Sequence, residues 1–225
     1  MKKKVIGISG VARAGKDTFA SILINQLNAL GKTVAKFAFA DALKQDCDSF
    51  CKEKLGISAF TQKTEEKLLI RPLLVWYGDA KRKQTNGRYW VDIIDKQVRA
   101  SNADFCIVTD VRYDFYPKDE INWVKGECDG VVVHVSRYSW DGLWEVADNK
   151  IRTMPHTILP DSKFRHRVFV QPANDHEREN DPKVKAKADR VVEWENVDGL
   201  TMEQLTFAPY LVAHVDEFIF KSRLV

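Results

Sequence analysis

The chain has 225 residues, of which 44% are hydrophobic and 30% charged, a balance typical of one globular domain with a full core. Its formal net charge of +3 is too small to indicate binding to nucleic acid or to a membrane surface. No apolar run reaches the roughly 18–20 residues that span a bilayer, and we expect no signal peptide. The cysteines form no CxxC pair, which favours reduced thiols. We therefore expect a cytoplasmic protein without nucleic-acid or membrane partners.

Short apolar runs predict the strands of a sheet. They are residues 4–9, 33–39, 105–109 and 131–135, with a weaker fifth run at 190–194. The first, third and fourth are almost continuously apolar, as is typical of central parallel strands covered on both faces.

Helical patterns lie between these runs and after them. They are residues 18–30, 40–55, 65–82, 89–100 and 117–127. The pattern at 202–220 is interrupted by Pro209, so it predicts two shorter helices. Strands that alternate with helices predict an α/β fold, in which a five-stranded parallel sheet carries helices on both faces.

The stretch 138–182 has a different composition. It is polar, contains several prolines, arginines and histidines, and shows no clear period over its length. Such a long segment is usually functional or disordered, and we interpret it as a lid-like insertion. Residues 1–225 then form a single domain.

The loop of residues 10–16 carries the clearest chemical signal, the pattern G-x-x-x-x-G-K between a predicted strand and a predicted helix. The glycines let successive backbone N–H groups point at phosphate oxygens, and the helix that follows adds its positive end. The pattern predicts a P-loop that binds a nucleoside triphosphate. The residues that we expect to bind it are Gly10, Ala12, Arg13, Ala14, Gly15, Lys16, Asp17 and Thr18.

The residue after Lys16 departs from the strict pattern, which has Ser or Thr there as a magnesium ligand. Here Asp17 follows, and Thr18 comes one place later. Asp17 could hold the metal through water and Thr18 could bind phosphate or metal. Asp17 could equally be a favourable acid in the first turn of a helix.

Charged residues also follow the other strands, at the edge where ligands bind in open parallel sheets. Asp110 comes directly after the third strand, where it could orient magnesium-bound water, cap a helix or pair with Arg112. Arg112 could hold a phosphate bidentately. Asp41 and Lys44 follow the second strand, and Arg137 follows the fourth.

Several of these segments occur in the same order in a known family. The segments are GVARAGKDT, FADALK, RPLLVWYGDAKRK with the later RYW, TDVRYDFYPKDE, and HVSR ending at Arg137, followed by His176 and Glu179. Together they resemble the deoxynucleoside monophosphate kinases of tailed bacteriophages. The resemblance implies a P-loop nucleoside monophosphate kinase that moves the γ-phosphate of ATP onto a deoxynucleoside monophosphate (dNMP), with Mg²⁺. It also implies the host cytoplasm as the compartment.

The resemblance assigns a role to each matching position. Lys16, Asp110, Arg112 and Arg137 become the catalytic residues, and Asp17, Thr18 and Asp110 the metal site. The acceptor site lies in the region 38–100 and includes Asp41, Lys44, Arg71, Arg82 and Trp90, together with Arg112. Glu120 anchors the loop that holds Arg112, and lid arginines such as Arg152 close over the phosphates. For Trp90, core packing is the alternative, because it lies on a helical pattern.

Two other functions remain open on the residues alone. One is another small-molecule kinase with a GKD loop, similar to phosphomevalonate or dephospho-coenzyme A kinases. The other is a P-loop switch or binding module that hydrolyses ATP without an acceptor. The sequence also leaves open whether the chain forms a homodimer.

Overall fold

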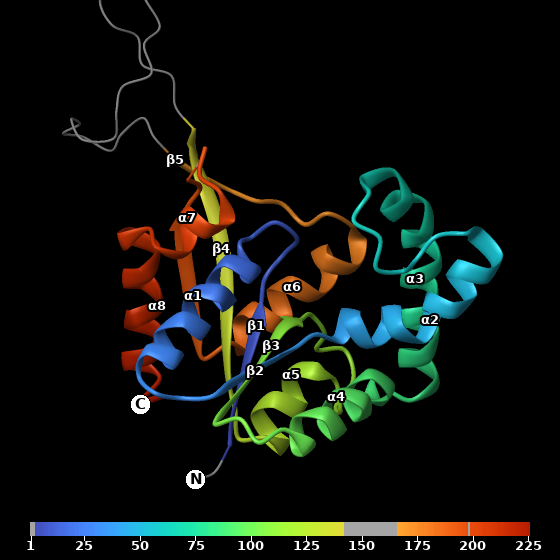
Figure 1. Ribbon diagram of the computed structural model, residues 1–225, viewed down its shortest axis with the longest axis horizontal. Coiled ribbons are helices and arrows are strands. Elements are labelled where there is room, and N and C mark those ends of the chain that lie inside the picture. The colour runs from blue at the N-terminus through green and yellow to red at the C-terminus, as the bar shows by residue number, and fades with distance from the viewer. Residues whose placement is uncertain (1–2, 142–165, 198) are drawn as a thin grey trace, which may run out of the picture.

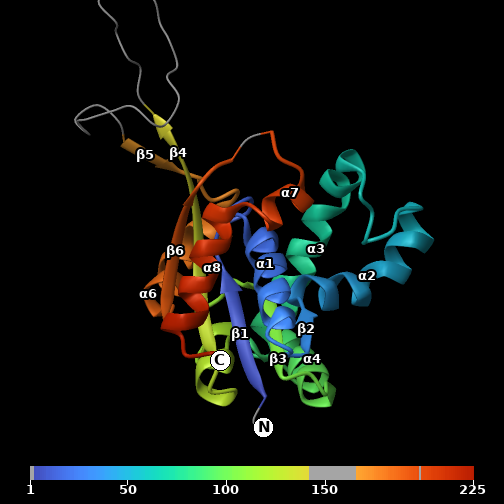
Figure 2. The same ribbon diagram turned by 60° about the vertical axis from the view of Figure 1, so that its left-hand side comes forward.

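The computed structural model of the chain describes residues 3–141, 166–197 and 199–225. These residues form a mixed α/β structure around a six-stranded, mostly parallel sheet (Figures 1 and 2). The strands are β1 (Lys4–Ser9), β2 (Val34–Phe37), β3 (Phe105–Val111), β4 (Val131–Asp141), β5 (His166–Phe169) and β6 (Arg190–Glu195).

The order of the parallel strands across the sheet is β2, β3, β1, β4 and β6. All of them coincide with predicted strands. The expectation of a purely parallel, five-stranded sheet is nevertheless wrong. β4 continues beyond Val135 to Asp141, and β5 pairs antiparallel with this extension. The extra residues of β4 carry backbone N–H and C=O groups that would be unpaired without a neighbouring strand. β5 pairs with them, and the shorter strand that the sequence predicted would not need this partner.

Helices cover both faces of the sheet. They are α1 (Lys16–Ala29), α2 (Phe39–Leu55), α3 (Thr64–Gln84), α4 (Arg88–Ala100), α5 (Glu120–Asn122), the π-helical η1 (Trp123–Glu127), α6 (Asp175–Lys187), α7 (Met202–Thr206) and α8 (Pro209–Lys221). None of the helices in the described residues is both long and apolar enough to cross a membrane.

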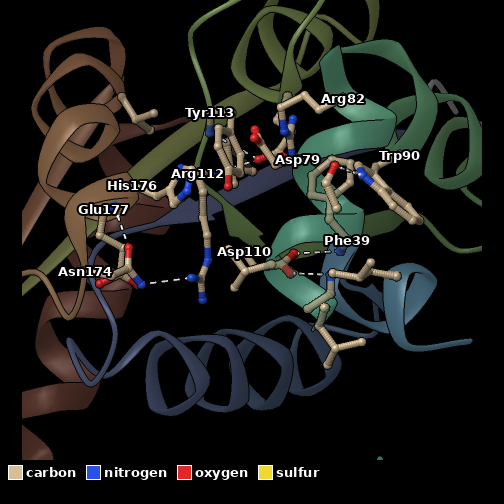
Figure 3. A pocket seen from close by; sticks show the side chains of 18 of the residues that line it. Phe39, Asp79, Arg82, Trp90, Asp110, Arg112, Tyr113, Asn174, His176 and Glu177 are labelled. Carbon is tan, nitrogen blue, oxygen red and sulfur yellow. Dashed lines mark hydrogen bonds and ion pairs between the residues drawn. The ribbon is translucent and has the colours of Figure 1, made fainter. Parts of the chain in front are cut away.

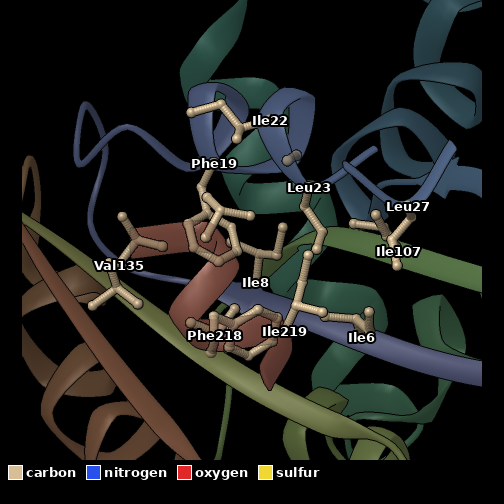
Figure 4. Close-up of a cluster of buried hydrophobic side chains, with 14 of the residues drawn as sticks. Ile6, Ile8, Phe19, Ile22, Leu23, Leu27, Ile107, Val135, Phe218 and Ile219 are labelled. Carbon is tan, nitrogen blue, oxygen red and sulfur yellow. The ribbon is translucent and has the colours of Figure 1, made fainter. Parts of the chain in front are cut away.

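The core lies in two layers, one on each face. On the first face, Phe19 and Leu23 of α1 and Phe218 of α8 pack against Ile6 and Ile8 of β1 (Figure 4). The opposite layer is built from α2, α4, η1 and α6, and its largest members are Trp90 and Trp123. Continuous apolar strands are therefore buried on both sides, as the sequence predicted.

Most predicted helices are confirmed, including the break at Pro209, which begins α8. The helix predicted at 117–127 starts later, at Glu120, and becomes π-helical. The reason is the Asp119 carboxylate, whose Oδ2 accepts hydrogen bonds from Phe115 N and Tyr116 N at 3.0 Å. These bonds close a turn in front of the helix, with Pro117 inside the turn.

The predicted lid at 138–182 needs correction at both ends. Residues 142–165, including Arg152, lie outside the described residues. The first part, up to residue 141, belongs to β4, and residues 166–169 form β5. The last part begins α6, which contains Pro182 and was not predicted. Its buried face consists of Glu177, Asn180 and Val184, so it shows almost no apolar period.

Candidate functional site

A pocket opens at the carboxyl ends of β1 and β3, bounded by α2, α3 and α6 (Figure 3). Its apolar wall comprises Phe39, Leu43, Leu74, Val75, Trp90 and Val184. Its charged and polar lining includes Arg71, Asp79, Arg82, Asp110, Arg112, Glu120, Asn174, His176, Glu177 and Asp181. Gly10 lies in the same wall, so the pocket joins the 10–16 loop to the helices of the region 38–100.

The 10–16 loop has a backbone that requires its two glycines. Gly10 and Gly15 have φ angles of 130° and 91°, which other residues rarely adopt. A Cβ atom on Gly10 would lie 2.2 Å from the Val135 carbonyl oxygen, and one on Gly15 would lie 2.7 Å from the Trp194 ring. Trp194 also donates its indole N–H to the Ala14 carbonyl at 3.0 Å. The loop is therefore pressed against β4 and β6 in one conformation.

Lys16 lies folded over this loop. Its Nζ donates hydrogen bonds to the carbonyl oxygens of Gly10 and Val11, both at 2.7 Å. Burial, helped by the nearby positive charge of Arg112, lowers the pKa of Lys16 to about 8, while Glu177 opposes this shift. A desolvated ammonium group beside a glycine-rich loop and a helix N-terminus is suited to binding an anion such as phosphate.

The residues expected to hold a metal have protein partners of their own. Asp17 is exposed and pairs with Lys36 at 3.2 Å. The buried Thr18 hydroxyl lies 3.5 Å from the Met202 sulfur. Within the described residues, no group of three or more His, Cys, Asp or Glu side chains could hold a metal ion. A magnesium ion here would take most of its ligands from a bound phosphate and water, which is how Mg²⁺ commonly binds in such sites.

Asp110 lies near the end of β3, and its side chain is buried against the start of α2. Its two carboxylate oxygens accept hydrogen bonds from Phe39 N at 2.8 Å and Ala40 N at 2.7 Å. Burial raises the pKa of Asp110, and the two backbone donors oppose that rise. Of the alternatives considered for this residue, capping of a helix is thus realised, and its role toward metal-bound water stays a prediction.

Arg112 is fixed at both its backbone and its side chain. Its backbone N–H donates to Glu120 Oε2 at 2.7 Å, and the N–H of Tyr113 donates to the same oxygen at 3.2 Å. Glu120 therefore anchors this loop, and burial raises the pKa of its carboxyl to about 7. The Arg112 guanidinium donates from Nη1 to Glu177 Oε1 at 3.0 Å. Arg112 thus pairs with Glu177 rather than with Asp110.

The arginines on α3 have different surroundings. Arg82 is buried, and its guanidinium pairs with Asp119 and Glu120, each at 2.7 Å, and stacks on Tyr113 at 3.5 Å. Arg71 is exposed, and within the described part of the chain it makes no ion pair. Of the two α3 arginines assigned to the acceptor, Arg71 can bind an anion, whereas Arg82 is held by its partners in the pocket wall.

The other assigned residues contribute less to the pocket. Asp41 and Lys44 pair with each other at 3.6 Å and do not line it, and neither does Arg137. The buried Nε of Arg137 has no hydrogen-bond partner among the described residues. Trp90 belongs to the core and also lines the pocket, and its role in binding an acceptor stays a prediction. Its indole N–H donates to the Gly78 carbonyl at 3.0 Å.

Sequence reasoning missed Glu177, which touches both the 10–16 loop and Arg112. The resemblance pointed to His176 and Glu179 instead. His176 lines the pocket, but Glu179 is exposed. The available signal was the spacing of Asn174 and Glu177, because Asn at a helix N-cap with Glu three residues later marks a helix start. The Asn174 side chain does accept a hydrogen bond from Glu177 N at 2.9 Å.

Comparisons with known proteins add little to this geometry. No protein-family model and no curated protein matches the chain. Among solved structures, the chain is similar to TT1252 from Thermus thermophilus, with 13% sequence identity and a TM-score of 0.41. The similarity covers 99% of this chain and 98% of that chain. At this level of structural overlap, the likeness carries no inference about function.

Proposed function

We propose that the protein is a P-loop kinase that transfers the γ-phosphate of ATP to a dNMP, giving dNDP and ADP, with Mg²⁺. The proposal rests chiefly on one observation, the pocket that has Gly10 of the 10–16 loop and residues of α2 and α3 in the same wall. A triphosphate bound along this loop would direct its terminal phosphate toward the space where an acceptor can lie.

The donor end of the pocket suits a triphosphate. The two glycines give the loop a fixed backbone turn, and in the described part of the chain the Lys16 ammonium group donates its hydrogen bonds to two backbone carbonyls. When a triphosphate binds, its charged oxygens would replace these neutral carbonyl oxygens as acceptors of the Lys16 hydrogen bonds. Charged acceptors form the stronger hydrogen bonds. Magnesium would neutralise the phosphate oxygens that the protein leaves uncontacted.

The acceptor end suits a nucleoside monophosphate. Phe39, Trp90 and Val75 offer apolar surface for a base, and the exposed Arg71 offers a charge for a phosphate. Arg112 lies between this end and the loop, where it can neutralise charge on the transferring group. No general base is required, because the acceptor phosphate is already an anion. Positioning and charge neutralisation therefore account for the chemistry that the pocket has to supply.

The test is ADP release from ATP and Mg²⁺ with each of the four dNMPs and their ribonucleotide counterparts. We expect at least one dNMP to stimulate release strongly. A preference for a non-nucleotide acceptor would favour another GKD-type kinase instead. Turnover that ignores every acceptor would favour an ATP-dependent switch.

A matched control for this assay is Lys16→Met, which removes the ammonium group and keeps an unbranched side chain only one atom shorter. We expect acceptor-dependent ADP release to fall by orders of magnitude while the circular-dichroism spectrum stays unchanged. Near-normal turnover in a folded variant would contradict the assignment of Lys16.

The same proposal implies a small-molecule acceptor, a cytoplasmic location and no nucleic-acid or membrane partner, and it leaves open a homodimer.

A further inference from the structure

Glu177 connects segments of the site that are far apart in the sequence. Its Oε2 accepts hydrogen bonds from Ala12 N in the 10–16 loop at 3.2 Å and from Ala173 N at 2.9 Å. Its Oε1 accepts from Arg112 Nη1 at 3.0 Å. Figure 3 shows Arg112 extending between Asp110 and the residues of α6. A buried carboxylate, 7% exposed, thus joins the loop after β1 to the loop after β3.

The position of Glu177 is itself fixed by the packing of α6. Asn174 caps the helix with its side chain, which accepts from Glu177 N at 2.9 Å. Further along the same face, Asp181 lies 3.0 Å from the Nε2 of His134 on β4, and Val184 is buried. Glu177 therefore projects from a helix that is attached to the sheet, which is how precise side-chain positions are maintained.

Among the described residues, the Arg112 guanidinium donates to Glu177 alone, which leaves donors on its other edges for a ligand. A guanidinium has five N–H donors in a fixed plane, and the contact with Glu177 uses one edge of that plane. The side chain of Arg112 is 39% exposed, so without this contact it could adopt other rotamers. Glu177 thus restricts the guanidinium to one orientation beside Lys16.

We propose that Glu177 is a positioning residue for phosphoryl transfer, which holds the Arg112 guanidinium toward the transferring phosphate. This inference rests on the proposed kinase function. Glu177 acts through Arg112 and does not touch the reacting groups. Loss of its charge should therefore affect the transfer step more than the binding of ATP.

The first test is kinetic and uses Glu177→Gln, with Glu179→Gln as the matched control on the exposed face of the same helix. We expect Glu177→Gln to lower kcat by about 10- to 100-fold and to change the KM for ATP by less than about 3-fold. Glu179→Gln should leave both unchanged. If Glu177→Gln retains the wild-type kcat, or raises only the KM for ATP, Glu177 has no positioning role.

A double-mutant cycle with Arg112→Ala separates positioning from general stability. If Glu177 acts through Arg112, the Gln substitution should cause little further loss of kcat when Arg112 is already absent. Equal losses in both backgrounds would overturn the inference. Should Glu177→Gln unfold, Glu177→Asp replaces it, because it keeps the charge and shortens the reach. Its effect on kcat should likewise disappear in the Arg112→Ala background.

A second readout needs no turnover. The NMR resonance of the Arg112 Nη1–H group, identified by its loss in Arg112→Ala, should be distinct in the wild type. In Glu177→Gln, but not in Glu179→Gln, it should merge with the resonances of solvent-exposed arginines. An unchanged resonance would refute the orientation by Glu177 even if the kinase assay succeeds. A wild type without acceptor-dependent ADP release would instead refute the kinase function, while this resonance would still decide whether Glu177 orders Arg112.

Discussion

At the scale of single residues, the partners of an arginine decide what it can do in this pocket. Arg82 is 7% exposed and is held between the carboxylates of Asp119 and Glu120. Arg71, eleven places earlier on α3, faces solvent at the pocket rim and has no ion pair within the described residues. The first residue is part of the structure that supports the site, and the second is available to an acceptor phosphate.

This difference predicts opposite phenotypes for the two alanine variants. Arg82→Ala leaves two buried carboxylates without their partner, so we expect the free energy of unfolding to fall by about 3–5 kcal/mol. Arg71→Ala should change that energy by less than about 0.5 kcal/mol and should raise the KM for the acceptor. Urea denaturation and acceptor titration measure the two effects. A stable Arg82→Ala variant with a raised acceptor KM would show that Arg82 binds the substrate directly.

The lowered pKa of Lys16 predicts a pH dependence of ATP binding. Below its pKa of about 8 the amine is protonated and attracts phosphate, and above it the charge is lost. Calorimetry without acceptor should therefore give a Kd for ATP that increases between about pH 8 and about pH 10, by up to about tenfold per pH unit. Lys16→Arg is the control, because its charge persists and its Kd should stay constant over the same range. A wild-type Kd that is flat with pH would contradict the role of Lys16.

The same shift has the opposite effect on folding. In the unfolded chain Lys16 keeps its proton up to its ordinary pKa of 10.5, whereas in the folded protein it releases the proton near 8. Between these values the unfolded state binds more protons, so the contribution of this group to the free energy of unfolding increases as the pH rises. ATP binding and stability should thus change in opposite directions above about pH 8.

At the scale of elements, α2 depends on a carboxylate from β3 for its first turn. Replacing Asp110 by alanine leaves the N–H groups of Phe39 and Ala40 without acceptors, at a cost of about 1–3 kcal/mol. We expect amide hydrogen exchange to accelerate at the start of α2 in Asp110→Ala, while β1 and β3 stay protected. The control is Asp17→Ala, at an exposed position in the first turn of α1, which should leave this exchange unchanged. Normal protection of α2 in Asp110→Ala would show that its first turn does not need the carboxylate.

The elements also show which parts of the site could be predicted from the sequence. Continuous apolar runs specify β1, β3 and β4, and the G-x-x-x-x-G-K spacing specifies the 10–16 loop, because these signals are local. The partner of a charged residue is not local. The sequence around Arg82 does not predict that this side chain pairs with Asp119 and Glu120, which lie far along the chain. Helix α6 was missed because its buried face carries Glu177 and Asn180, whose burial depends on partners in distant segments.

At the scale of the whole molecule, the parallel sheet brings distant segments to one edge. The loops after β1 and β3 meet there, and α2 and α6 lie on the same face of the sheet, where together with α3 they bound the pocket (Figure 1). This is where open α/β sheets bind their ligands. The arrangement supports a donor site on the 10–16 loop that opens directly into an acceptor site, so that two phosphates can lie in line.

The central claim is that phosphate moves between two nucleotides rather than to water. It is tested most directly with ATP labelled at the γ-phosphate, incubated with Mg²⁺, the protein and each dNMP in turn, followed by separation of the products. We predict that the label appears in the deoxynucleoside diphosphate, and that Lys16→Met prevents this. Label found only in inorganic phosphate, at a rate independent of the acceptor, would contradict the account.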